Sequence, residues 1–140
     1  MSRAINRDLE RDVRVRAAHR CEYCHLPESC ANLPHQIDHI IPHQHRGATS
    51  LENLALCCGP CNRHKGPNLT GIDPQTRQIV SLLNPRTDRW KDHFRWQGPV
   101  LVGLTEIGRA TIDVLSINLS PYVSRRRALM EGGKLPADFE

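Results

Sequence analysis

Four cysteines arranged as two pairs carry the clearest chemistry in this 140-residue sequence. Cys21 and Cys24 form one Cys-x-x-Cys pair, and Cys58 and Cys61 form a second pair after 33 intervening residues. A two-residue gap lets one tight turn present two sulfurs to one ion, and tetrahedral Zn²⁺ accepts four thiolates at about 2.3 Å. Four protein ligands leave no position for substrate, so the pairs predict one structural zinc ion.

Two alternatives to this zinc site stay open at the level of sequence. A dithiol redox pair would need only one Cys-x-x-Cys, and no thioredoxin-like βαβ pattern surrounds either pair. The cysteines could also be buried apolar thiols, which is the interpretation given to Cys30 and Cys57. Cys57 adjoins Cys58 and could replace it, although its three-residue gap to Cys61 fits the paired turn less well.

Between the cysteine pairs, a small group of side chains could perform hydrolytic chemistry. Asp38 offers a hard anionic oxygen suited to Mg²⁺ or Mn²⁺. His39 has an intrinsic pKa suited to accepting a proton near neutral pH. Asn53 and Asn62 add two amides. Each signal alone is weak, because an isolated Asp-His pair is more often a surface pair, and only their joint placement around the cysteines makes them candidates.

In chain order, the motifs Cys-x-x-Cys, Asp-His-Ile-Ile-Pro, Glu-Asn-Leu-Ala-Leu and Cys-x-x-Cys-Asn-x-x-Lys-Gly resemble those of the HNH endonucleases. The likeness, to a bacterial stand-alone subgroup, covers nearly the whole chain, and its specificity is concentrated in residues 21–66. The resemblance implies a small zinc-stapled ββα-metal core, treble-clef-like, within an α+β fold that has flanking helices and a short β-hairpin.

The resemblance also implies roles for individual residues. His39 corresponds to the general base, and Asn53 would use its side-chain carbonyl to keep the other ring nitrogen of His39 protonated. Asn62 stands where many members have His, and would share a catalytic Mg²⁺ or Mn²⁺ with Asp38. The implied products carry a 5′-phosphate and a 3′-hydroxyl.

Basic residues near these motifs are candidates for contact with DNA. Arg63, His64 and Lys65 follow Asn62 directly and are expected to meet phosphates. The family assigns no fixed role to His43, His45 and His64, for which loop or phosphate contact is favoured over a larger metal shell. The role of His35 is left open. The run 125–127 of three arginines is interpreted as a solvated helix face.

Periodicity and breaker residues predict the elements that must position these side chains. In the first half we expect a helix over 6–19 capped by Asn6, a strand over 35–41, and a short helix over 62–65 ended by Gly66. In the second half we expect a strand over 77–83, a helix over 88–94, a strand over 100–104, a helix over 105–118 and a last helix with Ser120 as its N-cap, ending at Met130.

Length and composition bound the fold and the cellular setting. The chain suits one domain over residues 1–140, with a zinc-bearing catalytic core at about 18–70 and a supporting α/β part at about 71–135. Aromatic residues make up only 4% of the chain, so a modest aliphatic core would benefit from a metal staple. The N-terminus lacks an apolar signal-like region, and no apolar run approaches the roughly 20 residues that cross a bilayer. A cytoplasmic protein with reduced thiols and no membrane association is therefore expected.

These observations predict an enzyme, a metal-dependent HNH endonuclease that hydrolyses DNA phosphodiester bonds. The net charge of +4 permits a polyanionic partner without requiring one. A non-catalytic zinc module that binds nucleic acid and a zinc domain for protein interaction are the rival interpretations. Target sequence, strand preference, RNA tolerance, oligomeric state and biological role are left open, and no obligatory protein partner is indicated.

Overall fold

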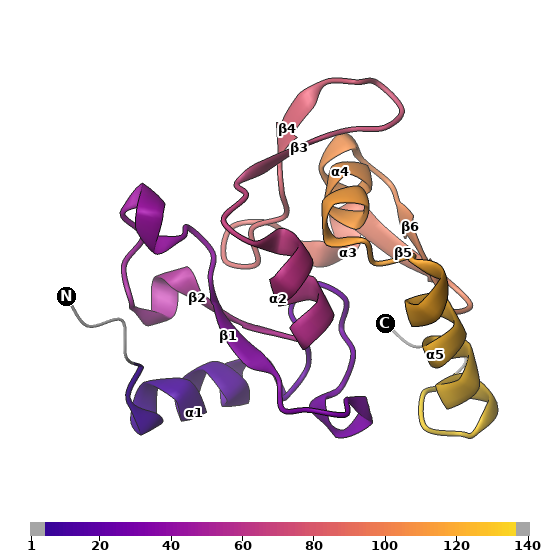
Figure 1. Ribbon diagram of the computed structural model, residues 1–140, viewed down its shortest axis with the longest axis horizontal. Coiled ribbons are helices and arrows are strands. Elements are labelled where there is room, and N and C mark those ends of the chain that lie inside the picture. Colours follow the sequence, from indigo (N-terminus) through magenta and orange to yellow (C-terminus); the bar gives the residue numbers. More distant parts are fainter. Residues whose placement is uncertain (1–4, 137–140) are drawn as a thin grey trace. The chain divides into compact units, whose positions relative to one another are not determined.

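The computed structural model describes residues 5–136 and combines helices with short antiparallel hairpins (Figure 1). The α+β class predicted from the sequence is confirmed. The chain divides into two compact units, Met1–Leu69 and Thr70–Glu140. Within the described residues, no helix is long and apolar enough to cross a membrane.

The first unit contains a two-stranded hairpin, and each of its strands contacts one helix. Its elements are α1 (Arg7–Arg16), β1 (Gln36–His39), β2 (Leu54–Cys57) and α2 (Gly59–Lys65), joined by 3₁₀ turns at Glu28–Cys30, His43–His45 and Leu51–Asn53. The strands pair antiparallel, with Gln36 opposite Cys57 and His39 opposite Leu54. Helix α1 contacts β2, and α2 contacts β1. The hairpin therefore brings the end of β1 to the helix that follows the second cysteine pair.

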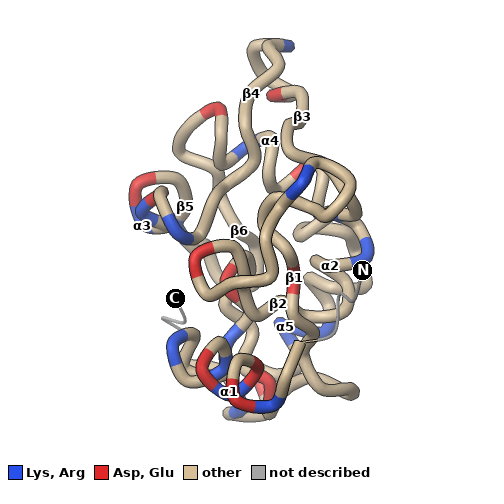
Figure 2. The backbone as a smooth tube through the Cα atoms, turned by 90° about the vertical axis from the view of Figure 1, so that its left-hand side faces the viewer, with Lys and Arg blue, Asp and Glu red and all other residues tan. Residues whose placement is uncertain are grey.

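Helix α1 forms where the sequence predicts it, although it ends at Arg16 rather than near residue 19. The side chain of Asn6 accepts a hydrogen bond from the backbone N–H of Leu9 at 2.8 Å and caps the helix. Acidic residues lie in its first turn and basic residues in its last turn, and both kinds are coloured along α1 in Figure 2. Val13 is fully buried against Leu54 and Leu56. Each such side chain contributes about 1.5–3 kcal/mol by leaving water, so this small apolar cluster anchors α1 to β2.

The second unit consists of two hairpins and three helices. Its elements are β3 (Thr70–Ile72), β4 (Ile79–Ser81), α3 (Trp90–His93), β5 (Phe94–Gln97), β6 (Val100–Gly103), α4 (Glu106–Leu115) and α5 (Ser120–Glu131). Helix α4 contacts β3, β4 and β6. The interior of the second unit is filled by buried apolar side chains, namely Leu82, Leu83, Phe94, Leu101, Ala110, Leu115, Ile117 and Leu135.

Several element boundaries differ from the sequence-based prediction. Strands β3 and β5 were not expected, and β5 begins where a helix over 88–94 was predicted to continue. Each strand is completed by its hairpin partner, a non-local hydrogen-bonding pattern that short apolar runs do not announce. The N-cap of α5 is Leu119, one residue earlier than predicted, and α2 begins at Gly59 because Pro60 suits a first turn.

Candidate metal centre and active site

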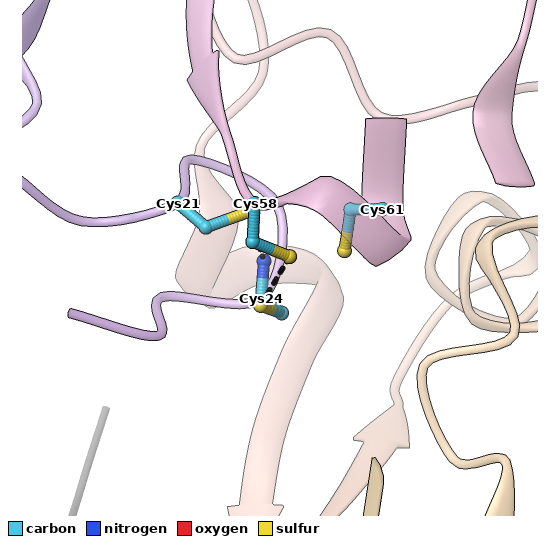
Figure 3. Close-up of side chains that lie close together, drawn as sticks. All are labelled: Cys21, Cys24, Cys58 and Cys61. Carbon is cyan, nitrogen blue, oxygen red and sulfur yellow. Dashed lines mark hydrogen bonds between the residues drawn. The ribbon is translucent and has the colours of Figure 1, made fainter. Parts of the chain in front are cut away.

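The four paired cysteines come together in the first unit (Figure 3). Their sulfurs all lie within 4.8 Å of one another, and each residue is buried. The two from the first pair lie on the loop after α1, Cys58 is the N-cap of α2, and Cys61 lies in its first turn. The prediction that these four cysteines gather, with Cys58 rather than Cys57 as the third, is confirmed.

The geometry of the cluster fits a zinc ion. The sulfurs of Cys24 and Cys58 are 3.7 Å apart. A regular tetrahedron with metal–sulfur bonds of about 2.3 Å has edges of about 3.8 Å. The backbone N–H of Cys24 also points to the sulfur of Cys21 at 3.5 Å, which supports a thiolate there. The cluster is thus shaped for a structural metal ion such as zinc.

The protonation of the thiols supports the same conclusion. Burial acts to raise the pKa of the Cys21 thiol, but hydrogen bonds from Cys24 and the other thiols outweigh it and lower that pKa well below its usual value. The pKa of Cys24 and of Cys61 is raised, first by the hydrogen bond to Cys21. These opposed directions arise from hydrogen bonds between the thiols, and a dication bound by the four sulfurs would instead favour the thiolate form of each.

The strand β1 directs a polar face toward α2. Asp38 is 5% exposed, and its Oδ2 accepts a hydrogen bond from the Tyr23 hydroxyl at 2.7 Å. The ammonium of Lys65, on α2, lies 3.2 Å from the same oxygen and 3.4 Å from Oδ1. Burial raises the pKa of Asp38, although the charge of Lys65 opposes this effect. The candidate metal ligand is therefore part of a buried ion pair.

His39, the last residue of β1, has a partner that sequence reasoning missed. Its Nε2 lies 2.9 Å from the hydroxyl oxygen of Thr49, an exposed loop residue. A hydrogen bond to one ring nitrogen fixes the ring and determines which nitrogen can accept a proton. Thr49 has no signal in the sequence, since a threonine in a polar loop is common. Its role depends on the course of the chain between β1 and β2.

Asn53 does not make the contact that the resemblance implied. Its Oδ1 accepts a hydrogen bond from the N–H of Ile41 at 2.9 Å, and its Nδ2 donates to the carbonyls of Ile41 and Ala48. These bonds differ from the expected one to the ring of His39: Asn53 connects the two ends of the loop that contains Thr49. Gly47 is required beneath this clamp, because an added Cβ would lie 1.7 Å from the carbonyl oxygen of Ile41.

Asn62 lies in α2 and faces β1, where its Nδ2 donates to Oε1 of Gln36 at 2.5 Å. A cavity of about 320 Å³ is lined by Asp38, His39 and Asn62, with Ile37, Pro42, His43, Gln44, Gly66 and Pro67. Oδ1 of Asp38 accepts a long hydrogen bond from the Lys65 ammonium, at 3.4 Å. One carboxylate and one neutral amide fit a Mg²⁺ or Mn²⁺ ion, which retains several water ligands.

Comparison with known proteins identifies this part of the chain. Residues 21–68 match the family model described as HNH endonuclease. The stretch is therefore similar to HNH endonucleases. No curated protein and no solved structure matches the chain. The match includes all four cysteines and both strands of the first hairpin, and it indicates a nuclease-type or nucleic-acid-binding role with a metal site.

The remaining candidate residues of the first unit have distinct surroundings. Arg63 is exposed on α2 and His64 is half-buried, whereas Lys65 is 2% exposed. The Lys65 ammonium could meet a phosphate only by leaving Asp38. Among the histidines without an assigned role, His35 is buried and bonds through Nε2 to the carbonyl of Leu26, while His43 lines the cavity. His45 is exposed in the same 3₁₀ turn as His43.

Proposed function

We propose that this protein is a metal-dependent endonuclease that hydrolyses phosphodiester bonds of DNA. The observation that carries the proposal is the cavity itself: an acid, an imidazole and an amide line one space inside the part of the chain that matches the HNH endonuclease family. These are the groups required to orient a hydrolytic water and to hold a divalent ion. The proposed cleavage site is the side of the cavity that His39 lines.

In this reaction His39 accepts a proton from a water molecule whose oxygen attacks the phosphorus atom. The bond from phosphorus to the 3′ oxygen breaks, and that oxygen leaves as a hydroxyl after taking up a proton. Thr49 holds the imidazole ring in place during the transfer. General-base assistance contributes roughly 10²–10⁴-fold to such a rate.

Asp38 and Asn62 are proposed to hold the divalent ion, which would stabilise negative charge on the phosphate and on the leaving oxygen. The exposed guanidinium of Arg63 is proposed to contact the DNA backbone beside the cavity. The four-cysteine cluster supports the helix that carries Asn62 and Arg63, because Cys58 is the N-cap of that helix and Cys61 lies in its first turn.

Nicking of supercoiled plasmid DNA in the presence of Mg²⁺ tests the proposal. His39→Ala is expected to lower the rate by about 10²-fold or more while zinc content and DNA affinity stay near parental values. Asp38→Ala should also be slow, but part of its loss should be recovered at high metal concentration. His93→Ala is a matched control, because His93 also bonds to a threonine hydroxyl but lies in the second unit.

A non-catalytic nucleic-acid-binding module is the second candidate, and the Asp38–Lys65 pair favours it. A carboxylate neutralised by an internal ammonium is a weaker ligand for a divalent ion. That function predicts salt-sensitive DNA binding without metal-dependent nicking. Nicking by His39→Ala at the parental rate would place the base elsewhere, and absence of nicking by the parent would favour the binding module.

A further inference from the structure

Lys65 is an unusual basic residue for this chain. The sequence has three lysines, Lys65, Lys91 and Lys134, against 16 arginines. Lys91 and Lys134 are exposed, whereas Lys65 is 2% exposed at the end of α2. A buried ammonium is unfavourable unless nearby oxygens replace the water that it loses. The surroundings of Lys65 should therefore reveal what its charge does.

Four oxygens from β1 and the residue after it surround the ammonium. Its Nζ lies 3.2 Å and 3.4 Å from the two carboxylate oxygens of Asp38, 3.4 Å from the carbonyl oxygen of His39 and 3.3 Å from that of Ile40. A carboxylate and backbone carbonyls are also the ligands that a hard metal ion accepts. The ammonium of Lys65 thus occupies a position that is surrounded by oxygens of the kinds that bind metal ions.

The charges around Asp38 balance without a metal ion. Tyr23, which bonds to Asp38, and Asn62, which lines the cavity, are uncharged side chains, and the imidazoles of His39 and His43 also line the cavity. The ammonium neutralises the single negative charge of the carboxylate. A divalent ion bound to the same carboxylate would therefore lie close to a like charge, which repels it strongly at low exposure to water. Both cations are unfavourable there together.

A lysine at position 65 is better suited than an arginine to release the carboxylate of Asp38. A lysine ammonium is compact, strongly hydrated and carried on a flexible stem, whereas an arginine fork is bound more rigidly by a carboxylate. Lys65 is the last residue of α2, and the next two residues, Gly66 and Pro67, line the cavity. The ammonium is therefore next to the space into which a metal ion and substrate would enter.

We propose that Lys65 is a resident cation of the candidate metal site: its ammonium neutralises Asp38 in the metal-free protein and leaves the carboxylate when a divalent ion binds. The inference rests on the proposed function only in taking Asp38 as a metal ligand. Metal binding then becomes an exchange of one cation for another, and the apparent metal affinity is lowered by the need to displace Lys65. The exchange also keeps the buried carboxylate compensated when no metal is present.

The first test measures Mn²⁺ binding to the zinc-loaded full chain, without any activity assay. Lys65→Met removes the charge but keeps an unbranched apolar stem, and we expect it to bind Mn²⁺ about tenfold more tightly than the parent. Tyr23→Phe is the matched control, because it removes an uncharged partner of the same carboxylate. It should leave the affinity within about twofold. Equal or weaker binding by Lys65→Met would overturn the proposal and make Lys65 a purely structural support.

The second test uses the parent protein and does not depend on the folding of a variant. Acylation of lysines by an amine-reactive reagent, read by mass spectrometry, compares Lys65 with the exposed Lys91 and Lys134 in one sample. Lys65 should react slowly without Mg²⁺ and several-fold faster at saturating Mg²⁺, while the other two are unchanged. A Lys65 rate that does not respond to Mg²⁺ would contradict the exchange.

Asp38→Asn separates this inference from the proposed function. Loss of Mn²⁺ binding in that variant supports Asp38 as the shared ligand of both cations. Unchanged Mn²⁺ binding would overturn the inference together with the proposed ligand. A parent that nicks DNA with Mg²⁺, combined with no tightening in Lys65→Met, would overturn the inference alone.

Discussion

The two units of this chain bury different kinds of groups. The interior of the first unit contains a metal-binding thiol cluster and the ion pair of Asp38 with Lys65 beside a small apolar cluster. The interior of the second unit is filled mainly by aliphatic side chains. Its described residues contain no such cluster of metal-binding side chains. The first unit therefore adds a metal-binding cluster to its small apolar core, whereas the second relies on removal of apolar surface from water together with the ion pair of Asp73 with Arg109.

Two kinds of side-chain hydrogen bond occur in both units but have different roles there. Asn53 bonds to both backbone groups of Ile41, and Asn118 bonds to both backbone groups of Leu101. A histidine bonds to a threonine hydroxyl in each unit, at His39 and at His93. In the first unit these bonds position a loop and a ring at the cavity. In the second unit they connect elements around an apolar core. A hydrogen bond thus gains its function from the site beside it, and each pair supplies a matched experiment.

Removal of zinc should have the largest effect and should separate the two units. A strong chelator, or Cys58→Ala, is expected to abolish hydrogen-exchange protection across β2 and α2, because structural zinc binding provides folding free energy. The second unit should remain folded. Both tryptophans of the chain, Trp90 and Trp96, lie in that unit, so their fluorescence reports its unfolding separately. A fluorescence midpoint that moves with zinc content would show that the units are not independent.

The asparagine clamps should distinguish a functional role from a purely structural one. Asn53→Ala removes three hydrogen bonds from the loop between β1 and β2, and should destabilise the first unit by about 1–3 kcal/mol. It should also slow Mg²⁺-dependent nicking by the folded protein. Asn118→Ala should lower the stability of the second unit by a similar amount, measured by urea unfolding, and leave nicking unchanged. Equal effects of both variants on nicking would contradict the placement of the site in the first unit.

The histidine–threonine pairs offer a finer comparison. Thr49→Val should slow nicking several-fold with little change in stability, since the bond to His39 is exposed. Thr49→Ser should restore the rate. Thr105→Val should lower stability and leave the nicking rate unchanged, because the Thr105 hydroxyl caps α4 by accepting a hydrogen bond from the N–H of Gly108. Loss of such a cap costs about 1 kcal/mol, which thermal unfolding can measure.

Acid pH should weaken the second unit through Asp73. Hydrogen bonds from Arg109 lower the pKa of Asp73 well below its usual value in the folded state. A carboxyl with a lowered folded-state pKa stabilises the fold above its unfolded pKa of about 3.9, and this stabilisation is lost as the pH falls further. The parent should therefore exceed Asp73→Asn in stability equally at pH 7 and pH 5, and by less at pH 3, as followed by tryptophan fluorescence. A difference that is constant down to pH 3 would contradict the assignment.

The sequence was most informative where short spacing alone carries the chemistry. Two Cys-x-x-Cys pairs predicted the four residues of the cluster, because a two-residue gap defines a turn regardless of the rest of the fold. The cap at Asn6 was predictable for the same reason, since an N-cap acts within one helical turn. The strand at β1 was also predicted from local alternation, with its ends displaced by one or two residues.

Contacts between distant segments were decided by the tertiary structure alone. The burial of Lys65 against Asp38, the bond of Thr49 to His39 and the clamp of Asn53 on Ile41 each join residues that are 10 or more positions apart. Arg126 illustrates the same limit, because it lies within a run of arginines expected to be solvated but is buried and bonds to the carbonyls of Pro99 and Ile117. A charged side chain has no intrinsic preference that reveals such a partner. Its burial is favourable only when the folded chain supplies oxygens to replace water, and those oxygens belong to residues that are distant in the sequence.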